Sequence, residues 1–323
     1  MKIFVTRKIP KPGLDLLRKE HDIEINPFNR VLTKKEIIKN LKGKDGLLCL
    51  LTDQIDEEVI VSEPRLKMIA CYAVGYDNID VKAATKQGVP VSNTPGVLTD
   101  ATSDMAWALL FSTARRIVEA DKFTRAGKFN GWDPMLMHGV DVTGKTLGVV
   151  GTGRIGAAFA LKSKGFDMKV LYVNLDKNVD LEKKIYAKKV TFEVLLKESD
   201  FISLHVPLIP STYHLIGEKE FKMMKKTAVL INSSRGPVID EKALAKALKK
   251  KWIFGAGLDV YEHEPKITKE LLYLDNVVLQ PHSASATIKS RTQMATLAAE
   301  NMIEGLKGLI PPNCINPEVF KQS

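Results

Sequence analysis

Three short segments carry side chains suited to proton transfer and to binding an organic acid. Each follows an apolar run typical of a strand, and they contain Arg235, Glu264 and His282. Ligands bind at the carboxyl ends of the strands in open α/β sheets, so the three residues are candidates for one site. Taken singly, each has an ordinary alternative: a surface arginine in a turn, a loop carboxylate before a proline, and a buried histidine with a hydrogen-bond partner. Together they are the groups that bind acidic ligands and transfer protons.

A fourth segment has the glycine spacing of a dinucleotide-binding turn. The apolar run 147–150 is followed by Gly151-Thr-Gly153-Arg-Ile-Gly156 and then by a helical pattern, which is the context that the G-x-G-x-x-G motif requires. The first glycine permits a tight turn, the second lets the backbone approach a pyrophosphate, and the third allows close packing of the helix. We therefore expect dinucleotide binding here, with a merely structural turn as the alternative.

The end of the next predicted strand bears on the choice of cofactor. An acidic residue there would accept hydrogen bonds from the adenosine ribose and repel a 2′-phosphate. The strand is followed by Asn174-Leu-Asp176-Lys177, in which Asn174 tolerates either cofactor and Asp176 favours NAD(H). No arginine is present there to bind a phosphate. The sequence predicts a preference for NAD(H), with NADP(H) as the alternative.

Two series of alternating strands and helices position these segments, which is the pattern of doubly wound parallel sheets. The first series predicts strands at 3–6, 23–25, 46–51, 66–71 and 89–91, and the second at 147–150, 169–173, 201–205, 228–232, 255–258 and 277–279. In the first series Thr33 and Glu36 form a predicted capping box, and Asp80 is a predicted N-cap.

Three further segments complete the expected architecture. Residues 100–126 predict one long helix that ends at Gly127 and buries more than one face. The arm 128–143 has no clean periodicity, and a segment of this kind could wrap around a partner subunit. A last helix near 286–306 follows the second series, so it can return to the first domain.

The composition is that of an ordinary globular protein. With 323 residues, 45% of them hydrophobic, the chain is long enough for two domains. Its formal charge of +10 is dispersed, and the densest lysine cluster lies on the polar face of a predicted helix, so we expect no nucleic-acid partner. The sequence lacks a signal peptide and an apolar run that could cross a bilayer, which predicts a cytosolic protein. Cys49, Cys71 and Cys314 match no metal motif or disulfide framework, so we expect reduced thiols and no bound metal.

Taken together, these segments resemble the D-isomer-specific 2-hydroxyacid dehydrogenase family, and within it the glyoxylate and hydroxypyruvate reductases. The resemblance covers essentially the whole chain. Further matching segments begin at Ala73, Thr94, Asp104, Asp141 and Ser203. It implies a Rossmann domain that binds NAD(P), residues 99–285, inserted in a flavodoxin-like substrate domain of residues 1–98 and 286–323. It also implies a homodimer that forms through the cofactor domain.

The resemblance further implies a reaction and a role for each matching residue. A small 2-keto acid would be reduced to its D-2-hydroxy acid by hydride from a nicotinamide. Arg235 would bind the carboxylate and the ketone, and His282 would protonate the carbonyl oxygen. Glu264 would hold the imidazole and favour its charged form. The backbone N–H groups of Val74 and Gly75 would bind the substrate carboxylate.

The matching positions define two sets of candidate residues. The cofactor set comprises Thr102, Gly151, Gly153, Arg154, Ile155, Gly156, Asn174, Asp176, His205, Val206, Pro207, Thr212, Ser233, Ser234, Asp259 and His282. The substrate set comprises Leu51, Ala73, Val74, Gly75, Arg235 and His282. Within the cofactor set, Asp259 would hold the nicotinamide carboxamide.

Two departures from the glyoxylate-reductase pattern and two alternative functions stand beside this interpretation. The segment after His282 reads Ser-Ala-Ser in place of Ile-Gly-Ser. The cofactor strand ends in Asn174 in place of a serine followed by arginine, which argues against a strict NADPH preference. The sequence does not select among 2-hydroxy acids, so D-lactate and phosphoglycerate are alternative substrates. A dinucleotide-sensing binding protein, like the transcriptional corepressors that share this fold and keep the three residues, is the other alternative.

Overall fold

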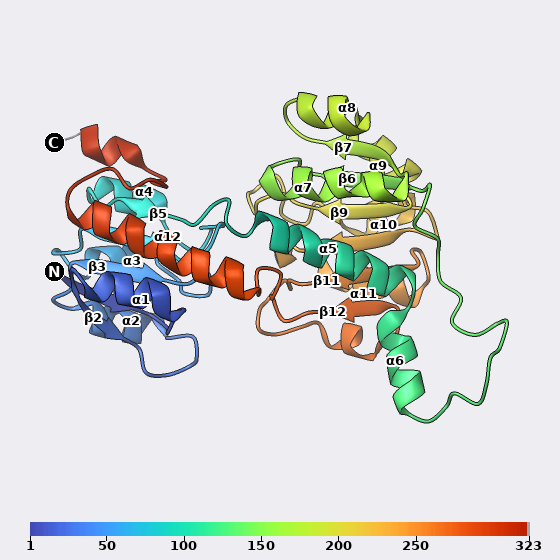
Figure 1. Cartoon of the computed structure of the whole chain (residues 1–323), viewed down its shortest axis with the longest axis horizontal. Helices are drawn as coiled ribbons and strands as arrows, with labels where there is room; N and C mark the ends of the chain where they lie inside the picture. Colours follow the sequence, from blue (N-terminus) through green and yellow to red (C-terminus); the bar gives the residue numbers. More distant parts are fainter. Residues whose placement is uncertain (322–323) are drawn as a thin grey trace. The chain divides into compact units, whose positions relative to one another are not determined.

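Two parallel sheets organise the chain, each in its own unit of the computed structural model, which describes residues 1–321 (Figure 1). Unit 1 combines Met1–Leu98 with Ala286–Ser323, and unit 2 is Thr99–Ser285. The last two residues of the predicted substrate domain, 322 and 323, lie outside the described residues. Every strand pair in both sheets is parallel, so the predicted α/β class with two doubly wound sheets is confirmed.

The sheet of unit 1 has the strand order β2-β1-β3-β4-β5, which is the flavodoxin-like order. Its strands are β1 (Lys2–Val5), β2 (Asp22–Ile25), β3 (Gly46–Cys49), β4 (Met68–Cys71) and β5 (Val91–Ser92). The central strands β3 and β4 are buried along their whole length, as expected for a parallel sheet covered on both faces. Strand β3 ends two residues earlier than predicted, because the Asp53 carboxylate accepts the N–H of Leu50 and helps to turn the chain.

The helices of unit 1 are α1 (Lys11–Arg18), α2 (Lys34–Leu41), α3 (Glu57–Val61), α4 (Val81–Lys86), α12 (Ile288–Leu306) and the 3-10 turn η4 (Pro317–Lys321). Four of them, α2, α3, α4 and α12, begin after a residue whose side chain caps the helix. The predicted capping box of Thr33 and Glu36 is present at the start of α2, and Asp80 caps α4 through the N–H of Ala83.

The last long helix, α12, packs on the sheet of unit 1 although it follows the strands of unit 2 in sequence. The hydroxyl of Tyr72 donates to the carbonyl of Arg291 at 2.8 Å, and the buried Asn301 side chain donates to the carbonyl of Asn93 at 3.0 Å. These bonds join the helix to the segments that follow β4 and β5. Helix α12 therefore lies on the sheet that the first series of strands forms.

The sheet of unit 2 has the order β12-β11-β10-β9-β6-β7-β8, which contains the Rossmann order of strands. Its strands are β6 (Thr146–Val150), β7 (Lys169–Val173), β8 (Lys188–Lys189), β9 (Phe201–Leu204), β10 (Val229–Asn232), β11 (Gly255–Leu258) and β12 (Val277–Leu279). The prediction of six strands missed β8, because two exposed lysines show no apolar pattern. Lysines on an edge strand discourage pairing with another chain, which fits their place at the end of the sheet.

Helices cover both faces of the sheet in unit 2 (Figure 1). The helices are α5 (Thr99–Ala114), α6 (Ile117–Arg125), α7 (Arg154–Lys162), α8 (Val179–Ile185), α9 (Phe192–Glu198), α10 (Glu218–Met223) and α11 (Glu241–Lys249), with 3-10 turns η1 (Ser163–Phe166), η2 (Gly236–Val238) and η3 (Lys269–Tyr273). Side chains of α5 and α7 fill one hydrophobic core, and those of α9, α10 and α11 fill the other. Both faces of the sheet are therefore covered by helices, and its strand ends are not.

The prediction of one helix over residues 100–126 is wrong, because the chain breaks between α5 and α6. Arg116 adopts the left-handed conformation with a φ of +53°, although no glycine or proline marks this position. The carbonyl of Ala114 accepts the N–H of Val140, which belongs to the returning arm. The Arg116 guanidinium also donates to Glu119 and to the carbonyl of His138. These bonds to distant residues end α5, and the sequence of the helix alone does not reveal them.

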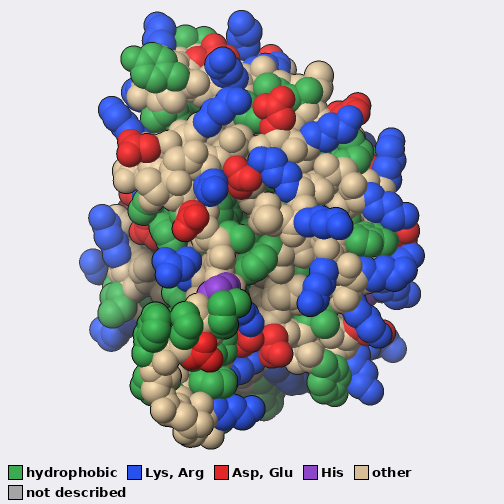
Figure 2. All heavy atoms as spheres, turned by 90° about the vertical axis from the view of Figure 1, so that its right-hand side faces the viewer, with side chains coloured by type: hydrophobic (Ala, Val, Ile, Leu, Met, Phe, Trp, Pro, Cys, Tyr) green, Lys and Arg blue, Asp and Glu red, His purple; other side chains and the backbone are tan. Residues whose placement is uncertain are grey.

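Neither a membrane span nor a metal cluster is found in the described part of the chain. No helix within residues 1–321 is long and apolar enough to cross a membrane. The same residues contain no group of three or more histidine, cysteine, aspartate or glutamate side chains that could hold a metal ion. The face shown in Figure 2 carries scattered lysine and arginine side chains with acidic side chains among them.

Candidate active site

Three neighbouring strands of unit 2 place the predicted catalytic residues at one edge of the sheet. Strands β10, β11 and β12 pair in parallel and in register, so their carboxyl ends lie together. Arg235 follows β10, Glu264 follows β11, and His282 follows β12. Arg235 and His282 are 47 positions apart in the sequence, and the structure brings both of them and Glu264 to one edge.

His282 and Glu264 are in direct contact at this edge. The His282 Nδ1 atom lies 2.9 Å from Glu264 Oε2, and Glu264 Oε1 accepts the N–H of Tyr261 at 3.0 Å. Burial by itself would raise the pKa of Glu264. The hydrogen bond and charge of His282 oppose burial, as do the Tyr261 N–H and the charge of Arg235, and their sum holds the pKa of Glu264 below its usual value. The carboxylate is therefore ionised and directed at the imidazole.

The loop that carries His282 is fixed by Asp259, the residue that directly follows β11. The two carboxylate oxygens of Asp259 accept the N–H groups of Ser283 at 2.7 Å and Ala284 at 2.8 Å. His282 has a φ of +52°, in the left-handed region, where a residue with a side chain costs about 1–3 kcal/mol. Asp259 is fully buried, and this burial raises its pKa despite the two backbone donors. Both of its oxygens are thus engaged in holding the histidine loop.

The turn that carries Arg235 is shaped by Asn232, the last residue of β10. The amide nitrogen of Asn232 donates to the carbonyl of Arg235 at 2.9 Å, and its oxygen accepts the N–H and the hydroxyl of Ser234 at 3.0 and 2.8 Å. The hydroxyl of Ser234, a predicted cofactor residue, is therefore engaged within the turn. The neighbouring Ser233 hydroxyl is buried and has no hydrogen-bond partner among the described residues.

The glycine turn between β6 and α7 has room for a pyrophosphate. Gly151 has a φ of +89°, and a side-chain carbon at Gly156 would lie 2.0 Å from the Gly151 carbonyl oxygen, so both positions require glycine. A side-chain carbon at Gly153, in contrast, would meet no atom within 4 Å. Gly153 is also the N-cap of α7 and provides no side-chain cap for the N–H groups of that helix. The Thr152 hydroxyl is buried without a partner among the described residues, so donors and open space both fit a dinucleotide.

The end of β7 is an ordered turn built on Asn174. The Asn174 side-chain oxygen accepts the N–H of Thr152 at 3.2 Å, and its nitrogen donates to the carbonyl of Asp176 at 3.2 Å. The Asn178 side chain donates to the carbonyl of Thr152 at 3.1 Å. Asn174 therefore connects the end of β7 to the glycine turn, while Asp176 is exposed beside it.

The remaining predicted cofactor residues lie at three places in unit 2. Thr102 is buried in the first turn of α5, Arg154 and Ile155 open α7, and the loop after β9 contains His205, Val206, Pro207 and Thr212. The His205 ring bonds to the Ser203 hydroxyl at 2.9 Å and packs on the ring of Phe159. Burial lowers the pKa of His205 to about 3, so its ring is neutral. The Thr212 hydroxyl donates to the carbonyl of Pro207 at 2.6 Å and closes this loop.

The predicted substrate residues of unit 1 lie at the carboxyl ends of its two central strands. Leu51 follows β3, and Ala73, Val74 and Gly75 follow β4, the strand next to it. The carbonyl of Val74 accepts the Asn93 side chain at 2.7 Å, and the carbonyl of Ala73 accepts the N–H of Thr94 at 2.8 Å. The loop that follows β4 is therefore held by its carbonyl groups.

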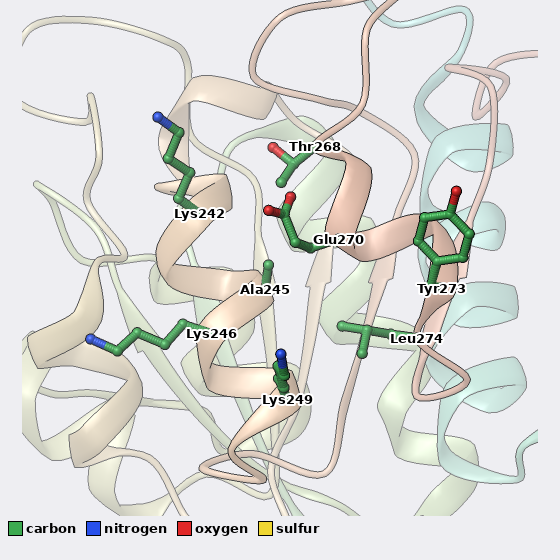
Figure 3. A pocket seen from close by; sticks show the side chains of 8 residues that line it. All are labelled: Lys242, Ala245, Lys246, Lys249, Thr268, Glu270, Tyr273 and Leu274. Atoms are coloured by element: carbon green, nitrogen blue, oxygen red, sulfur yellow. The ribbon is translucent and has the colours of Figure 1, made fainter.

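A pocket of about 600 Å³ lies elsewhere in unit 2, between α11 and η3 (Figure 3). Its lining residues are Lys242, Ala245, Lys246, Lys249, Thr268, Glu270, Tyr273 and Leu274. A large apolar pocket is the usual first candidate for a ligand site. None of the predicted site residues lines this pocket, and it contains no histidine or arginine. The acid–base groups at the strand ends therefore define the candidate active site.

Sequence reasoning missed a second histidine–glutamate pair near the site. The His214 Nε2 atom lies 2.8 Å from Glu262 Oε1. Glu262 stands two residues before Glu264 in the same segment, so its carboxylate was a visible signal. His214 follows β9 by ten residues and carries no local signal of its partner.

The chain is similar to known dehydrogenases in sequence and in fold. Residues 107–284 match the NAD binding domain of the D-isomer specific 2-hydroxyacid dehydrogenases. The glyoxylate reductase of Thermococcus litoralis is 52% identical over 326 residues, which cover 100% of this chain and 98% of that protein. Among solved structures, the TT0316 protein of Thermus thermophilus has a TM-score of 0.91 at 41% identity and covers 98% of this chain and 100% of that chain.

A third relative was solved with a cofactor. The NADPH-dependent glyoxylate/hydroxypyruvate reductase of Sinorhizobium meliloti, in complex with NADP and malonate, has a TM-score of 0.86 at 28% identity and covers 97% of this chain and 96% of that chain. The predicted resemblance is thus confirmed over the whole length of the chain. The protein belongs to the D-isomer specific 2-hydroxyacid dehydrogenase family and carries that family's NAD-binding domain.

Proposed function

We propose that the protein reduces a small 2-keto acid, glyoxylate or hydroxypyruvate, to the D-2-hydroxy acid with a reduced nicotinamide dinucleotide. The observation that carries the proposal is the 2.9 Å contact between His282 and Glu264 at the sheet edge that also bears Arg235. The full-length similarity to a glyoxylate reductase supports the choice of substrate class.

In this proposal His282 is the proton donor. Its Nδ1 atom is occupied by Glu264, so Nε2 is the nitrogen that holds the proton for the ketone oxygen. The ionised Glu264 accepts from Nδ1 and fixes the orientation of the ring. The bound dinucleotide supplies the hydride that reaches the carbonyl carbon. In the reverse direction the same Nε2 atom accepts the proton of the hydroxyl group.

Arg235 is the substrate-binding cation of the proposal. Its guanidinium has donors in a planar fork, which can bind the carboxylate and the ketone oxygen of the same keto acid. We assign the N–H groups of Val74 and Gly75 to the substrate carboxylate as well, and Leu51 and Ala73 to the walls of its pocket. Residues 1–98 with 286–323 are then the substrate domain, and 99–285 the cofactor domain.

For the cofactor we propose a preference for NAD(H) over NADP(H). Residues 174–177, which directly follow β7, contain no arginine, and the exposed carboxylate of Asp176 would repel a 2′-phosphate. The Sinorhizobium meliloti relative is NADPH-dependent, so the preference needs a direct comparison. We expect the kcat/KM for NADH to exceed that for NADPH, and the reverse order would refute the preference.

The experiment that tests the function is absorbance loss at the reduced-nicotinamide band. Glyoxylate, hydroxypyruvate and pyruvate are each tested with NADH and with NADPH. Robust turnover with glyoxylate or hydroxypyruvate supports the proposal, and turnover with pyruvate alone would move the substrate to D-lactate. Tight dinucleotide binding without turnover of any 2-keto acid would favour the dinucleotide-sensing binding protein.

We also propose that the protein is a homodimer, formed through α6 and the arm 128–143. Helix α6 has no buried residue, and in Figure 1 the arm runs away from the sheet of unit 2. Phe129, Trp132 and Met135 are exposed in the arm, and Trp132 is 85% exposed. Figure 2 shows hydrophobic side chains gathered in the lower part of its face. An exposed apolar surface of this kind is typical of an interface.

Light scattering tests the dimer with a matched pair of variants. Tyr186 is also 85% exposed but lies at the end of α8, outside the arm. We expect Trp132→Glu to weaken the dimer and Tyr186→Glu to leave it intact. A monomeric wild-type protein would contradict the proposal.

A further inference from the structure

The second histidine–glutamate pair of unit 2 combines a short contact with a shielded carboxylate. His214 Nε2 and Glu262 Oε1 are 2.8 Å apart, and the side chain of Glu262 is only 11% exposed. His214 has a φ of +47°, a left-handed conformation that residues with a side chain rarely adopt. Because the carboxylate of Glu262 is shielded from solvent, this contact differs from the exposed ion pairs that contribute little to stability.

The histidine of this pair belongs to a segment that is bonded to the Arg235 loop. The N–H of His214 donates to the carbonyl of Pro237 at 2.8 Å, and the N–H of Ile216 donates to the carbonyl of Val238 at 3.1 Å. Pro237 stands two residues after Arg235. The backbone of His214 therefore holds the loop that carries the proposed substrate-binding arginine.

The glutamate of the pair belongs to the segment that carries Glu264. Glu262 Oε2 accepts the N–H of Glu241, the first residue of α11, at 3.1 Å. The backbone of Gly236 lies so close to that of Tyr261 that a side-chain carbon at Gly236 would be 1.9 Å from the Tyr261 carbonyl carbon. The Arg235 loop and the Glu264 segment are thus in direct contact and leave no space between them.

We propose that His214 and Glu262 are positioning residues that fix Arg235 and Glu264 relative to each other. This proposal rests on the proposed function, because it assigns a task to the same site. His214 holds the Arg235 loop through its backbone and the Glu264 segment through its ring, so loss of the ring breaks this link between the two. A misplacement of about 1 Å in an active site can cost about 100-fold in rate, so a pair outside the reacting atoms can matter for turnover.

A double-mutant cycle separates positioning from ordinary stability. We expect His214→Leu to lower kcat/KM for the keto acid by about 10- to 100-fold and to leave the Kd of NADH within about twofold. In a Glu264→Gln background the same change should lower kcat/KM by less than about threefold, because the Glu264 carboxylate that His214 helps to position is already gone. A purely structural role would cost the same factor in both backgrounds, and this result would overturn the proposal.

Three further variants serve as controls. His214→Gln keeps a donor that can reach Glu262, so it should recover most of the activity lost in His214→Leu. His263→Gln removes an imidazole 3.8 Å from the same carboxylate, but this imidazole is 74% exposed, so activity should stay within about twofold. If His214→Leu does not fold, as loss of NADH binding would indicate, Glu262→Gln takes its place in the cycle with the same expectation.

A crystal structure of His214→Leu distinguishes failure of this proposal from failure of the proposed function. We expect the distance between His282 Nδ1 and Glu264 Oε2 to lengthen beyond hydrogen-bond range. Retention of the 2.9 Å contact together with an unmoved Arg235 loop would overturn the positioning role, whatever the substrate. A wild-type protein that turns over no keto acid would instead refute the proposed function and leave this structural readout valid.

Discussion

His282 Nδ1 lies 2.9 Å from Glu264 Oε2, and the other oxygen of Glu264 is held by the N–H of Tyr261. The carboxylate is therefore fixed from both sides, and the imidazole can present only Nε2 to a ligand. Since burial of Glu264 is outweighed by its charged and hydrogen-bonded neighbours, the carboxylate is ionised where the imidazole needs a counter-charge. One contact thus sets both the orientation of the ring and the nitrogen that carries the mobile proton.

The first prediction concerns the proton donor itself. We expect His282→Ala to lower kcat by about 100- to 10,000-fold, because a positioned general acid contributes about this factor. The Kd of NADH, measured by fluorescence titration, should change by less than about twofold. His263→Ala, which removes an exposed imidazole one residue before Glu264, should retain normal turnover. A His282→Ala enzyme with a near-normal rate would refute the assignment.

The second prediction concerns the pH dependence that Glu264 confers. Its pKa in the folded protein lies below its value in the unfolded chain, so the ionised form contributes stability that is fully present above the unfolded value. That contribution is lost as the pH falls through the folded value. Glu264→Gln has no such titration, so the difference in Tm between wild type and variant should shrink on acidification. A constant difference from neutral to acidic pH would contradict this prediction.

The same variant should also slow keto-acid reduction. Glutamine keeps the shape of Glu264 but removes its negative charge and one oxygen acceptor, so the imidazole is held less firmly. We expect the kcat of Glu264→Gln to fall by about tenfold or more. Steady-state kinetics measure this loss, and a kcat equal to that of the wild type would mean that Glu264 has no part in turnover.

The sequence was sufficient to find the residues that lie at strand ends. Apolar runs before Arg235, Glu264 and His282 placed each residue after a strand, and parallel pairing brings such ends together whatever the distance in sequence. The glycine turn and the caps at Thr33 and Asp80 were also predictable, because each depends on a few consecutive residues. The two caps are confirmed, whereas the single helix over 100–126, which also came from a local pattern, is wrong.

The features that the sequence did not reveal depend on contacts between distant residues. The break between α5 and α6 depends on a bond from Val140 to the Ala114 carbonyl, 26 residues away in sequence, counting from 114 to 140. The His214–Glu262 pair spans 48 residues. Strand β8 consists of two exposed lysines and owes its conformation to pairing with β7. None of these partners has a signal in the local pattern of hydrophobic residues.

The third prediction concerns the loop that Asp259 holds. Its pKa is raised by burial, so stability from this group is present below the unfolded value and is lost as the pH rises through the folded one. At neutral pH Asp259→Asn removes the cost of burying a charged carboxylate. It also leaves one fewer acceptor for the N–H groups of Ser283 and Ala284. We expect Tm to change by only a few degrees, because the two effects oppose each other. The kcat should fall by about tenfold or more, because His282 is less firmly held.

The control for this change is another aspartate that accepts a backbone N–H. Asp80 caps α4 through the N–H of Ala83, and asparagine is an equally good cap, so Asp80→Asn should leave both kcat and Tm nearly unchanged. If Asp259→Asn also retains full kcat, the loop is held by other contacts and Asp259 has no positioning role.

The fourth prediction compares alanine substitutions at Gly153, in the dinucleotide turn, and at Gly165, outside that turn. A side-chain carbon at Gly153 or at Gly165 would meet no atom within 4 Å, and neither residue has a left-handed φ, so alanine fits at both positions. We expect both variants to fold with a Tm close to that of the wild type. Gly153 lies where the turn would approach a pyrophosphate, so its methyl group should raise the Kd of NADH by about tenfold or more, whereas Gly165→Ala should bind normally. Equal NADH affinity in the two variants would mean that the dinucleotide does not approach Gly153.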